Sequence, residues 1–152
     1  MIRKATVSDV KPIKGLINLY ADRGDMLPRA LGELYDSLRD FHVYEDDGRV
    51  IGVAALHVGW EGLAEVRSVA VDPAYLGKGI GRALVSACLE DAKALGVREV
   101  FVLTYVDKFF RKMGFSDASH DDLPQKVWTE CRNKCTKYPD TCNETAMTLN
   151  LD

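Results

Sequence analysis

The chain has 152 residues, of which 47% are hydrophobic and 28% charged, and its formal net charge is −3 at pH 7. This size and composition are typical of one globular domain with a single core, and the acidic balance excludes the basic footprint of a nucleic-acid-binding protein. The N-terminal segment has no apolar signal region, and the apolar stretch from Val53 to Val58 is too short to span a bilayer. We therefore expect a cytoplasmic, single-domain protein over residues 1–152, with neither nucleic acid nor membrane as a partner.

Apolar periodicity predicts that strands and helices alternate along the first half of the chain. Proline is tolerated in the first turn of a helix, and an Asp-Gly pair is typical of a hairpin turn. The expected elements are a strand over 2–5, a helix ending at 23–25, a second helix from near Pro28, and an antiparallel strand pair over 41–45 and 50–58.

The stretch from Leu63 to Gly96 combines a strand, a glycine-rich turn and a helix, and the rest of the chain is expected to be organised around it. Residues 63–71 are predicted to form a strand that Asp72-Pro73 ends, because proline cannot donate to a ladder. Apolar residues at helical spacing predict a helix from about Gly79 to Leu95, with Gly96 as its left-handed C-terminal cap.

The second half of the chain is predicted to continue the same sheet. A strand is predicted over 98–103, where the continuous apolar run from Val100 to Leu103 is typical of a strand buried on both faces. It makes residues 63–104 a right-handed strand–helix–strand crossover. A short helix over 108–113 and a final strand over 145–151 follow.

The turn Leu76-Gly77-Lys78-Gly79-Ile80-Gly81 has a glycine at every second position. Glycine leaves the backbone open where it turns into a helix, so that N–H groups and the positive end of the helix dipole can face an anion. The spacing matches neither a dinucleotide fingerprint nor a P-loop. It predicts a pyrophosphate cradle, with a ligand-free strand-to-helix connection as the alternative.

The order of strand, Val-x-Val-Asp-Pro and x-Gly-x-Gly-Ile-Gly resembles motif A of the GNAT superfamily of N-acetyltransferases. Ile2 to Thr6 is similar to that family's first strand and Phe109 to Phe115 to its motif B, whereas Leu76 replaces the Gln or Arg that usually opens the glycine motif. The resemblance implies an α/β fold with a mixed, mostly antiparallel sheet of six or seven strands, flanking helices and a central βαβ unit that binds acetyl-CoA.

The resemblance also implies which residues hold acetyl-CoA as a cosubstrate. In the family a bulge frees the N–H groups of the first strand of the βαβ unit, and the pantetheine arm pairs with it as an extra strand would. The oxyanion donors expected on this basis are the main-chain groups of Val69 and Val71. The full set expected to contact acetyl-CoA is Val69, Ala70, Val71, Leu76, Gly77, Lys78, Gly79, Ile80, Gly81 and Arg82.

Acyl transfer from a thioester to an amine needs a base for the ammonium, a stabilised oxyanion and a proton for the departing thiolate. In an unbroken strand Glu65, Arg67, Val69 and Val71 share one face. Glu65 is therefore the candidate base, and it matches the general base of several GNAT enzymes. A structural ion pair between Glu65 and Arg67 is the alternative.

The acid is less evident, because Phe110 occupies the position at which GNAT proteins often have a tyrosine in Tyr-x-Lys-x-Gly-Phe. Tyr105, at the end of the buried strand, is the nearest replacement as the catalytic acid. The alternatives are a Tyr105 that only packs at the strand end and a thiolate that takes its proton from water.

Several segments are similar to the acetyltransferase domain of N-acetylglutamate synthases in its short, single-domain form. This resemblance implies acetylation of the α-amine of L-glutamate, for arginine biosynthesis, and it does not imply control by arginine. Another amino acid, a polyamine, a protein N-terminus and a non-catalytic acetyl-CoA-binding module remain alternatives. The segments concerned are 28–29, 64–71, 101–105, 109–110 and 123–128.

A dicarboxylic amino acid requires cationic clamps, for which arginine is the better bidentate partner. Hydroxyl groups add hydrogen bonds, and a cationic site disfavours polyamines because like charges repel. The candidate acceptor-binding residues are Arg29, Arg67, Ser68, Thr104 and Lys126.

The remaining titratable and thiol groups are expected to be structural. Cys131, Cys135 and Cys142 with His120 have a weak metal-ligand spacing, so reduced thiols and no metal are expected. A homodimer is the default oligomer. The predicted core or structural residues are Cys88, His42 and His57.

Overall fold

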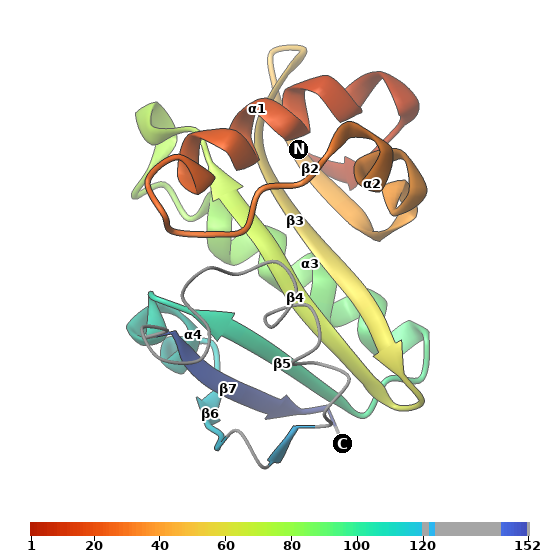
Figure 1. Ribbon diagram of the computed structural model, residues 1–152, viewed down its shortest axis with the longest axis vertical. Coiled ribbons are helices and arrows are strands. Elements are labelled where there is room, and N and C mark those ends of the chain that lie inside the picture. The colour runs from red at the N-terminus through yellow and green to blue at the C-terminus, as the bar shows by residue number, and fades with distance from the viewer. Residues whose placement is uncertain (120–121, 124–143, 152) are drawn as a thin grey trace.

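The computed structural model describes residues 1–119, 122–123 and 144–151. Within these ranges seven strands form one sheet in the order β1-β2-β3-β4-β5-β7-β6 (Figure 1). All neighbouring pairs are antiparallel except β4 and β5, which confirms the mixed, mostly antiparallel sheet and its central βαβ unit. The strands are β1 (Ile2–Lys4), β2 (Phe41–Asp46), β3 (Arg49–Trp60), β4 (Leu63–Val71), β5 (Glu99–Thr104), β6 (Ser116–Asp117) and β7 (Thr145–Asn150).

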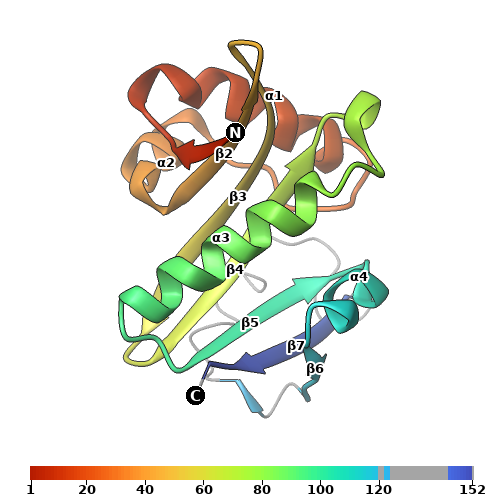
Figure 2. The ribbon, with the colours of Figure 1, turned by 180° about the vertical axis from the view of Figure 1, so that it is seen from behind.

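The helices cover both faces of the sheet. Figures 1 and 2 show α1 and α2 on one face and α3 on the other, with α4 beside the end of β5. No helix in the described ranges has the length and apolarity needed to cross a membrane. The helices are α1 (Val10–Ala21), α2 (Leu31–Asp36), α3 (Ile80–Ala94) and α4 (Asp107–Lys112), with 3-10 turns η1 (Val7–Asp9), η2 (Leu38–Asp40) and η3 (Pro73–Tyr75).

The second helix is shorter than its apolar pattern predicts. It begins at Leu31 instead of near Pro28, because the backbone of Ala30 is still extended, with φ −72° and ψ 153°. It ends at Asp36, where the Ser37 hydroxyl donates a 2.7 Å hydrogen bond to the Glu33 carbonyl. Such a local side-chain bond competes with the helical ladder, and the chain continues as η2.

Two apolar clusters hold the helices to the sheet. One lies between α3 and strands β3, β4 and β5, and the other lies between α1 and β2, β3 and β4. At Gly52 on β3, a β-carbon would lie 2.9 Å from Leu84 and 3.0 Å from Ile80 of α3. The missing side chain at Gly52 therefore allows the first turns of α3 to pack directly on the sheet, which positions the glycine loop that precedes them.

Strand β4 contains a bulge at Ser68. Val53 pairs with Ala70 and Ala55 with Arg67, so β4 has one more residue than β3 across this interval. Ser68 takes up the extra residue with φ 56°. The bulge that the family resemblance implies is therefore present, and the unbroken alternation that placed Val69 and Val71 on the face of Glu65 is wrong. The alternation of side chains between the two faces of the sheet reverses at the bulge. Val69 and Val71 therefore pack on the α3 side instead of sharing a face with Glu65.

Strands β4 and β5 diverge beyond Glu65, before the bulge is reached. They pair in parallel only from Leu63 with Glu99 to Glu65 with Phe101, although β4 continues to Val71. The edge of β4 that faces β5 is thus open over its last residues, next to the start of α3.

Candidate active site

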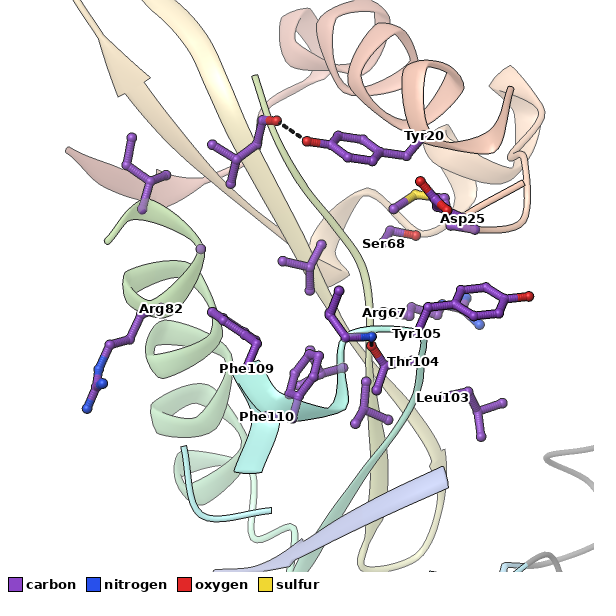
Figure 3. A pocket seen from close by; sticks show the side chains of 18 of the residues that line it. Tyr20, Asp25, Arg67, Ser68, Arg82, Leu103, Thr104, Tyr105, Phe109 and Phe110 are labelled. Carbon is purple, nitrogen blue, oxygen red and sulfur yellow. Dashed lines mark hydrogen bonds between the residues drawn. The ribbon is translucent and has the colours of Figure 1, made fainter. Parts of the chain in front are cut away.

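A cavity of about 540 Å³ lies where β4 and β5 diverge (Figure 3). Its walls come from the loop between α1 and α2, the bulged part of β4, the glycine loop, the end of β5 and the start of α4. Three features of chemical interest converge on it: an anion-binding turn, an open strand edge and a set of charged side chains.

The glycine loop has the conformation of an anion-binding turn. Gly77 and Gly79 both have φ 80°, a region that side-chain-bearing residues avoid. A β-carbon at either position would meet nothing within 4 Å, so the backbone conformation is what requires glycine there. Gly79 caps α3, whose first N–H groups have no partner within the helix. Because Gly77, Gly79 and Gly81 line the cavity, this turn can receive a phosphate.

The neighbours of these glycines differ in their relation to the cavity. Leu76, Ile80 and Arg82 line it. Figure 3 shows Arg82 projecting from α3 away from the labelled aromatic side chains. Lys78 is not among the lining residues, and its ammonium lies 5.2 Å from the centroid of the Tyr75 ring. A cation–π contact therefore turns Lys78 toward η3.

The open edge of β4 presents main-chain groups to the cavity. The Asp72 N–H donates to the Ile51 carbonyl of β3 at 2.8 Å. Since successive peptide groups of a strand point in opposite directions, the N–H and C=O of Val71 face away from β3, as do those of Val69. The Tyr20 hydroxyl of α1 donates a 2.6 Å hydrogen bond to the Val71 carbonyl from this side (Figure 3). Burial raises the pKa of Tyr20, which keeps its hydroxyl a donor.

Ala70 does not belong to this edge. Its side chain is buried in the cluster beneath α1 and does not line the cavity. Its peptide alternates with that of Val71 and turns toward β3, where Ala70 pairs with Val53. The bulge at Ser68 decides which peptide groups of β4 face β3 and which face the cavity, and an unbroken alternation could not predict this.

Glu65 and Arg67 lie side by side on β4 and both line the cavity. A guanidinium nitrogen of Arg67 is 3.6 Å from a carboxylate oxygen of Glu65, and the two side chains are 17% and 18% exposed. The ion pair considered from the sequence is thus present. It lies within the cavity, so a structural contact and a chemical role are compatible.

The end of β5 contributes Thr104 and Tyr105 (Figure 3). The Thr104 hydroxyl accepts a 2.9 Å hydrogen bond from the Val106 N–H and so fixes the turn that carries Tyr105. Below them, Phe110 is buried and contacts the rings of Phe109 and Phe115 edge-on. Its ring centroid lies 4.9 Å from that of Phe109 and 5.3 Å from that of Phe115. Phe110 therefore forms an apolar floor, and the phenol that the end of β5 adds to the cavity wall is that of Tyr105.

Arg29 lines the cavity from the segment between α1 and α2, and its side chain is 10% exposed. The Lys14 ammonium donates a 2.7 Å hydrogen bond to the Arg29 carbonyl, which ties this segment to α1. A carboxylate oxygen of Glu33 lies 3.8 Å from the Arg29 guanidinium. Arg29 thus brings a largely buried guanidinium, paired with Glu33, to the wall of the cavity.

Most residues singled out from the sequence line the cavity; Ala70 and Lys78 do not, and Lys126 lies outside the described residues. His120 and the three C-terminal cysteines also lie outside them. Among the residues that are described, no group of three His, Cys, Asp or Glu side chains could hold a metal ion. The lining residues that sequence reasoning missed include Tyr20, Asp25, Met26, Leu27, Tyr75, Leu103 and Glu144.

Of the missed residues, Asp25, Met26 and Leu27 could have been suspected, since they directly precede the Pro28-Arg29 pair already singled out. Tyr20 ends the apolar stripe of the first helix, so its sequence signal is that of a core residue. Nothing in the local sequence indicates that its hydroxyl reaches β4.

Diverging parallel strands, an open strand edge and a phosphate-binding turn at one cavity are the features of an acyltransferase whose donor has a phosphorylated carrier. A family model described as the Acetyltransferase (GNAT) family matches residues 15–115, and the chain belongs to this family. Its activity is accordingly that of an N-acetyltransferase.

Two relatives that are similar over most of this chain agree with this assignment. The chain is 39% identical over 150 residues to an uncharacterized N-acetyltransferase of Chlorobaculum tepidum, covering 99% of this chain and 96% of the relative. It is 41% identical over 137 residues to the amino-acid acetyltransferase of Mycobacterium tuberculosis, covering 88% of this chain and 78% of that relative.

Solved structures show the same fold. A Mycobacterium tuberculosis protein crystallised in complex with CoA and NLQ superposes with a TM-score of 0.88 at 36% identity, covering 100% of this chain and 99% of the other. N-acetylglutamate synthase of Neisseria gonorrhoeae, complexed with coenzyme A and N-acetyl-glutamate, superposes with a TM-score of 0.90 at 27% identity. This chain is covered completely in that superposition and spans 35% of the synthase.

Proposed function

We propose that the protein transfers the acetyl group of acetyl-CoA to the α-amine of L-glutamate by direct attack, without an acyl-enzyme. The observation that carries the proposal is the convergence of Glu65, Arg67 and Arg29 on the cavity that contains the glycine loop. The relatives add support, since one is an amino-acid acetyltransferase and another is a synthase complexed with N-acetyl-glutamate. In this role the protein serves arginine biosynthesis.

The donor lies along β4. The diphosphate of acetyl-CoA binds the N–H groups at the start of α3, and the pantetheine arm extends along the open edge. The Val69 and Val71 N–H groups face that arm, and such main-chain donors also stabilise the oxyanion that forms on the thioester carbonyl. This arrangement aims the thioester at the bulge, where Glu65 and Arg67 lie on the adjoining strand segment.

The chemistry follows from the charges that must move. Glu65 takes a proton from the substrate ammonium, and the free amine attacks the thioester carbon. The tetrahedral intermediate then collapses with loss of the CoA thiolate. Tyr105, at the end of β5, gives its proton to that thiolate, and the second proton of the amine nitrogen passes to the phenolate through water, so that Tyr105 is restored and one proton remains on Glu65. Glu65 and Tyr105 both line the cavity, on the two strands between which the substrates meet.

The acceptor is recognised through its two carboxylates. Arg29 and Arg67 bind these groups, and the hydroxyls of Ser68 and Thr104 add hydrogen bonds. Lys126 is a further cationic clamp in this proposal, on grounds of sequence. These three cations repel a polyamine and attract carboxylates, so they favour a dicarboxylic amino acid as the acceptor.

Glu65→Gln is the variant that tests the assignment of the base. Glutamine keeps the shape of the side chain and removes its basicity, so kcat with acetyl-CoA and L-glutamate is expected to fall by roughly 10²-fold or more. Free thiol released per second is the measurement, and calorimetry with CoA should show unchanged affinity. Glu90→Gln, on the exposed face of α3 with a side chain 75% accessible, is the matched control and should keep full turnover. Full turnover in Glu65→Gln would contradict the proposed mechanism.

A further inference from the structure

A second acidic and basic pair lies on the same face of the sheet as Glu65. His57 of β3 has its Nδ1 atom 2.8 Å from a carboxylate oxygen of Asp40, the last residue of η2. The two side chains are 42% and 28% exposed. A hydrogen bond at this distance assigns the proton to Nδ1, and the other ring nitrogen, Nε2, is then the one that can accept a proton.

His57 is the direct cross-strand partner of Glu65. The register pairs Val58 with Ala64, His57 with Glu65 and Leu56 with Val66, and the bulge at Ser68 lies beyond this regular segment. Cross-strand partners project from the same face of a sheet, with β-carbons roughly 4.5–5.5 Å apart. The imidazole is therefore the next titratable side chain across the strands from Glu65, and it is the more exposed of the two.

The proposed reaction creates a need for such a group. The substrate enters as an ammonium and leaves as an amide, so it loses two protons per turnover, of which the CoA thiolate takes one. The second proton stays on Glu65 until it is passed to solvent. Glu65, whose side chain is 18% exposed and lies beside a guanidinium, therefore has to lose this proton once in every cycle.

We propose that His57, oriented by Asp40, passes the proton from Glu65 to bulk solvent. Through one bridging water, Nε2 takes the proton that Glu65 has received from the ammonium. The imidazolium donates to Asp40 through Nδ1, and Nε2 then releases its proton to the solvent that its exposed face contacts. This restores a neutral His57 and an ionised Glu65, so no charge is left in the site.

The charged groups around His57 agree with this direction of transfer. Asp40 faces it from η2, Glu65 is its cross-strand partner on β4, and Arg67 is paired with Glu65. Asp40 holds the Nδ1 side of the ring by the 2.8 Å hydrogen bond. Arg67 lies against Glu65, where it favours return of the carboxylate to its charged form. Neither His57 nor Asp40 touches the reacting atoms, so both act through Glu65 as positioning residues, and the inference rests on the proposed function.

His57→Asn is the variant that tests the relay. The asparagine amide occupies the place of Nδ1 and keeps a donor toward Asp40, but it cannot carry a proton. We expect kcat to fall roughly 10-fold, less than the 10²–10⁴-fold of a direct acid or base, while the KM values for both substrates are unchanged. Added imidazole should restore much of the lost rate in proportion to its concentration. Asp40→Asn should show a smaller loss of kcat, and Glu61→Gln, in the exposed turn between β3 and β4, should behave as the wild type.

Rescue by imidazole separates a relay from a structural clamp between η2 and β3, because a clamp would not respond to a soluble base. Wild-type kcat in His57→Asn, or a loss that imidazole does not restore, would overturn the relay. If Glu65→Gln is inactive while His57→Asn has full kcat, the relay fails and the proposed function stands. If Glu65→Gln has full kcat, the assignment of the base fails first.

Discussion

The glycine loop allows backbone conformation and ligand binding to be tested separately. Gly79 has φ 80° and caps α3, so Gly79→Ala forces a side chain into the left-handed region at a cost of about 1–2 kcal/mol. In a protein of this size such a loss lowers Tm by roughly 2 to 8 °C. Because a β-carbon at Gly79 would meet nothing within 4 Å, crowding adds nothing to this figure.

Gly81 is the matched position within the first turn of α3. A β-carbon there would lie 3.7 Å from the Phe109 ring and 3.8 Å from Val71, which are ordinary contacts. Gly81→Ala should therefore leave stability unchanged or raise it by up to about 1 kcal/mol, since alanine is the better helix former. The added methyl group nevertheless lies on the cavity wall beside the proposed phosphate site. We expect the Kd for CoA to rise by roughly tenfold, which corresponds to about 1.4 kcal/mol.

The assays are thermal unfolding without ligand and isothermal titration calorimetry with CoA. The expected pattern is a lower Tm for Gly79→Ala, and an unchanged or higher Tm with weaker CoA binding for Gly81→Ala. A wild-type Tm in Gly79→Ala would refute the conformational reasoning. Wild-type affinity in Gly81→Ala would refute the placement of the phosphates at the start of α3.

Three further predictions concern the scaffold around the site. Hydrogen bonds from the Arg3 guanidinium lower the pKa of Asp9 from 3.8 to about 2. The pair therefore stabilises the fold fully at a pH above 3.8, and roughly 2 kcal/mol of the free energy of unfolding is lost as the pH falls from there to about 2. Acid denaturation followed by circular dichroism should lack this component in Asp9→Asn, and an identical pH profile would count against the pair. Burial raises the pKa of the Cys88 thiol to about 12, so iodoacetamide should not alkylate it in the native protein at neutral pH, as mass spectrometry can check. Rapid labelling of the native protein would be inconsistent with the burial of this thiol. Tyr20→Phe removes the hydrogen bond to the Val71 carbonyl and should lower the urea midpoint by the equivalent of about 1 kcal/mol at constant m, whereas an unchanged midpoint would mean that water replaces the hydroxyl at no cost.

The parts of the fold that depend on local chemistry follow from the sequence. Helix α3 begins one residue after Gly79 and ends one before Leu95, and Gly96 has φ 83° as its predicted cap requires. Glycine conformation, proline exclusion and apolar periodicity are properties of neighbouring residues, so they can be recognised without knowledge of the fold. The antiparallel meander and the parallel β4–α3–β5 unit follow from the same kind of pattern.

The position of the bulge in β4 could not be predicted from the residues themselves, because nothing in the composition of residues 63–71 indicates an extra residue at Ser68. Only the family resemblance implied a bulge in this strand. That single insertion moves Val69 and Val71 to the α3 side of the sheet and places Ala70 beneath α1. Contacts between distant segments were missed for a related reason. The hydroxyl bond from Tyr20 to Val71 and the pairing of His57 with Glu65 exist only once the sheet has formed.

The central claim is that the cavity acetylates the amine of a dicarboxylic amino acid. The most direct measurement is a competition assay in which acetyl-CoA is incubated with the protein and an equimolar mixture of L-glutamate, L-glutamine, L-aspartate, L-ornithine and spermidine, and the products are identified by mass spectrometry. The account predicts that N-acetyl-L-glutamate is the main product and that its formation is abolished in Glu65→Gln. Preferential acetylation of spermidine, or acetylation of no amino acid in the mixture, would contradict it.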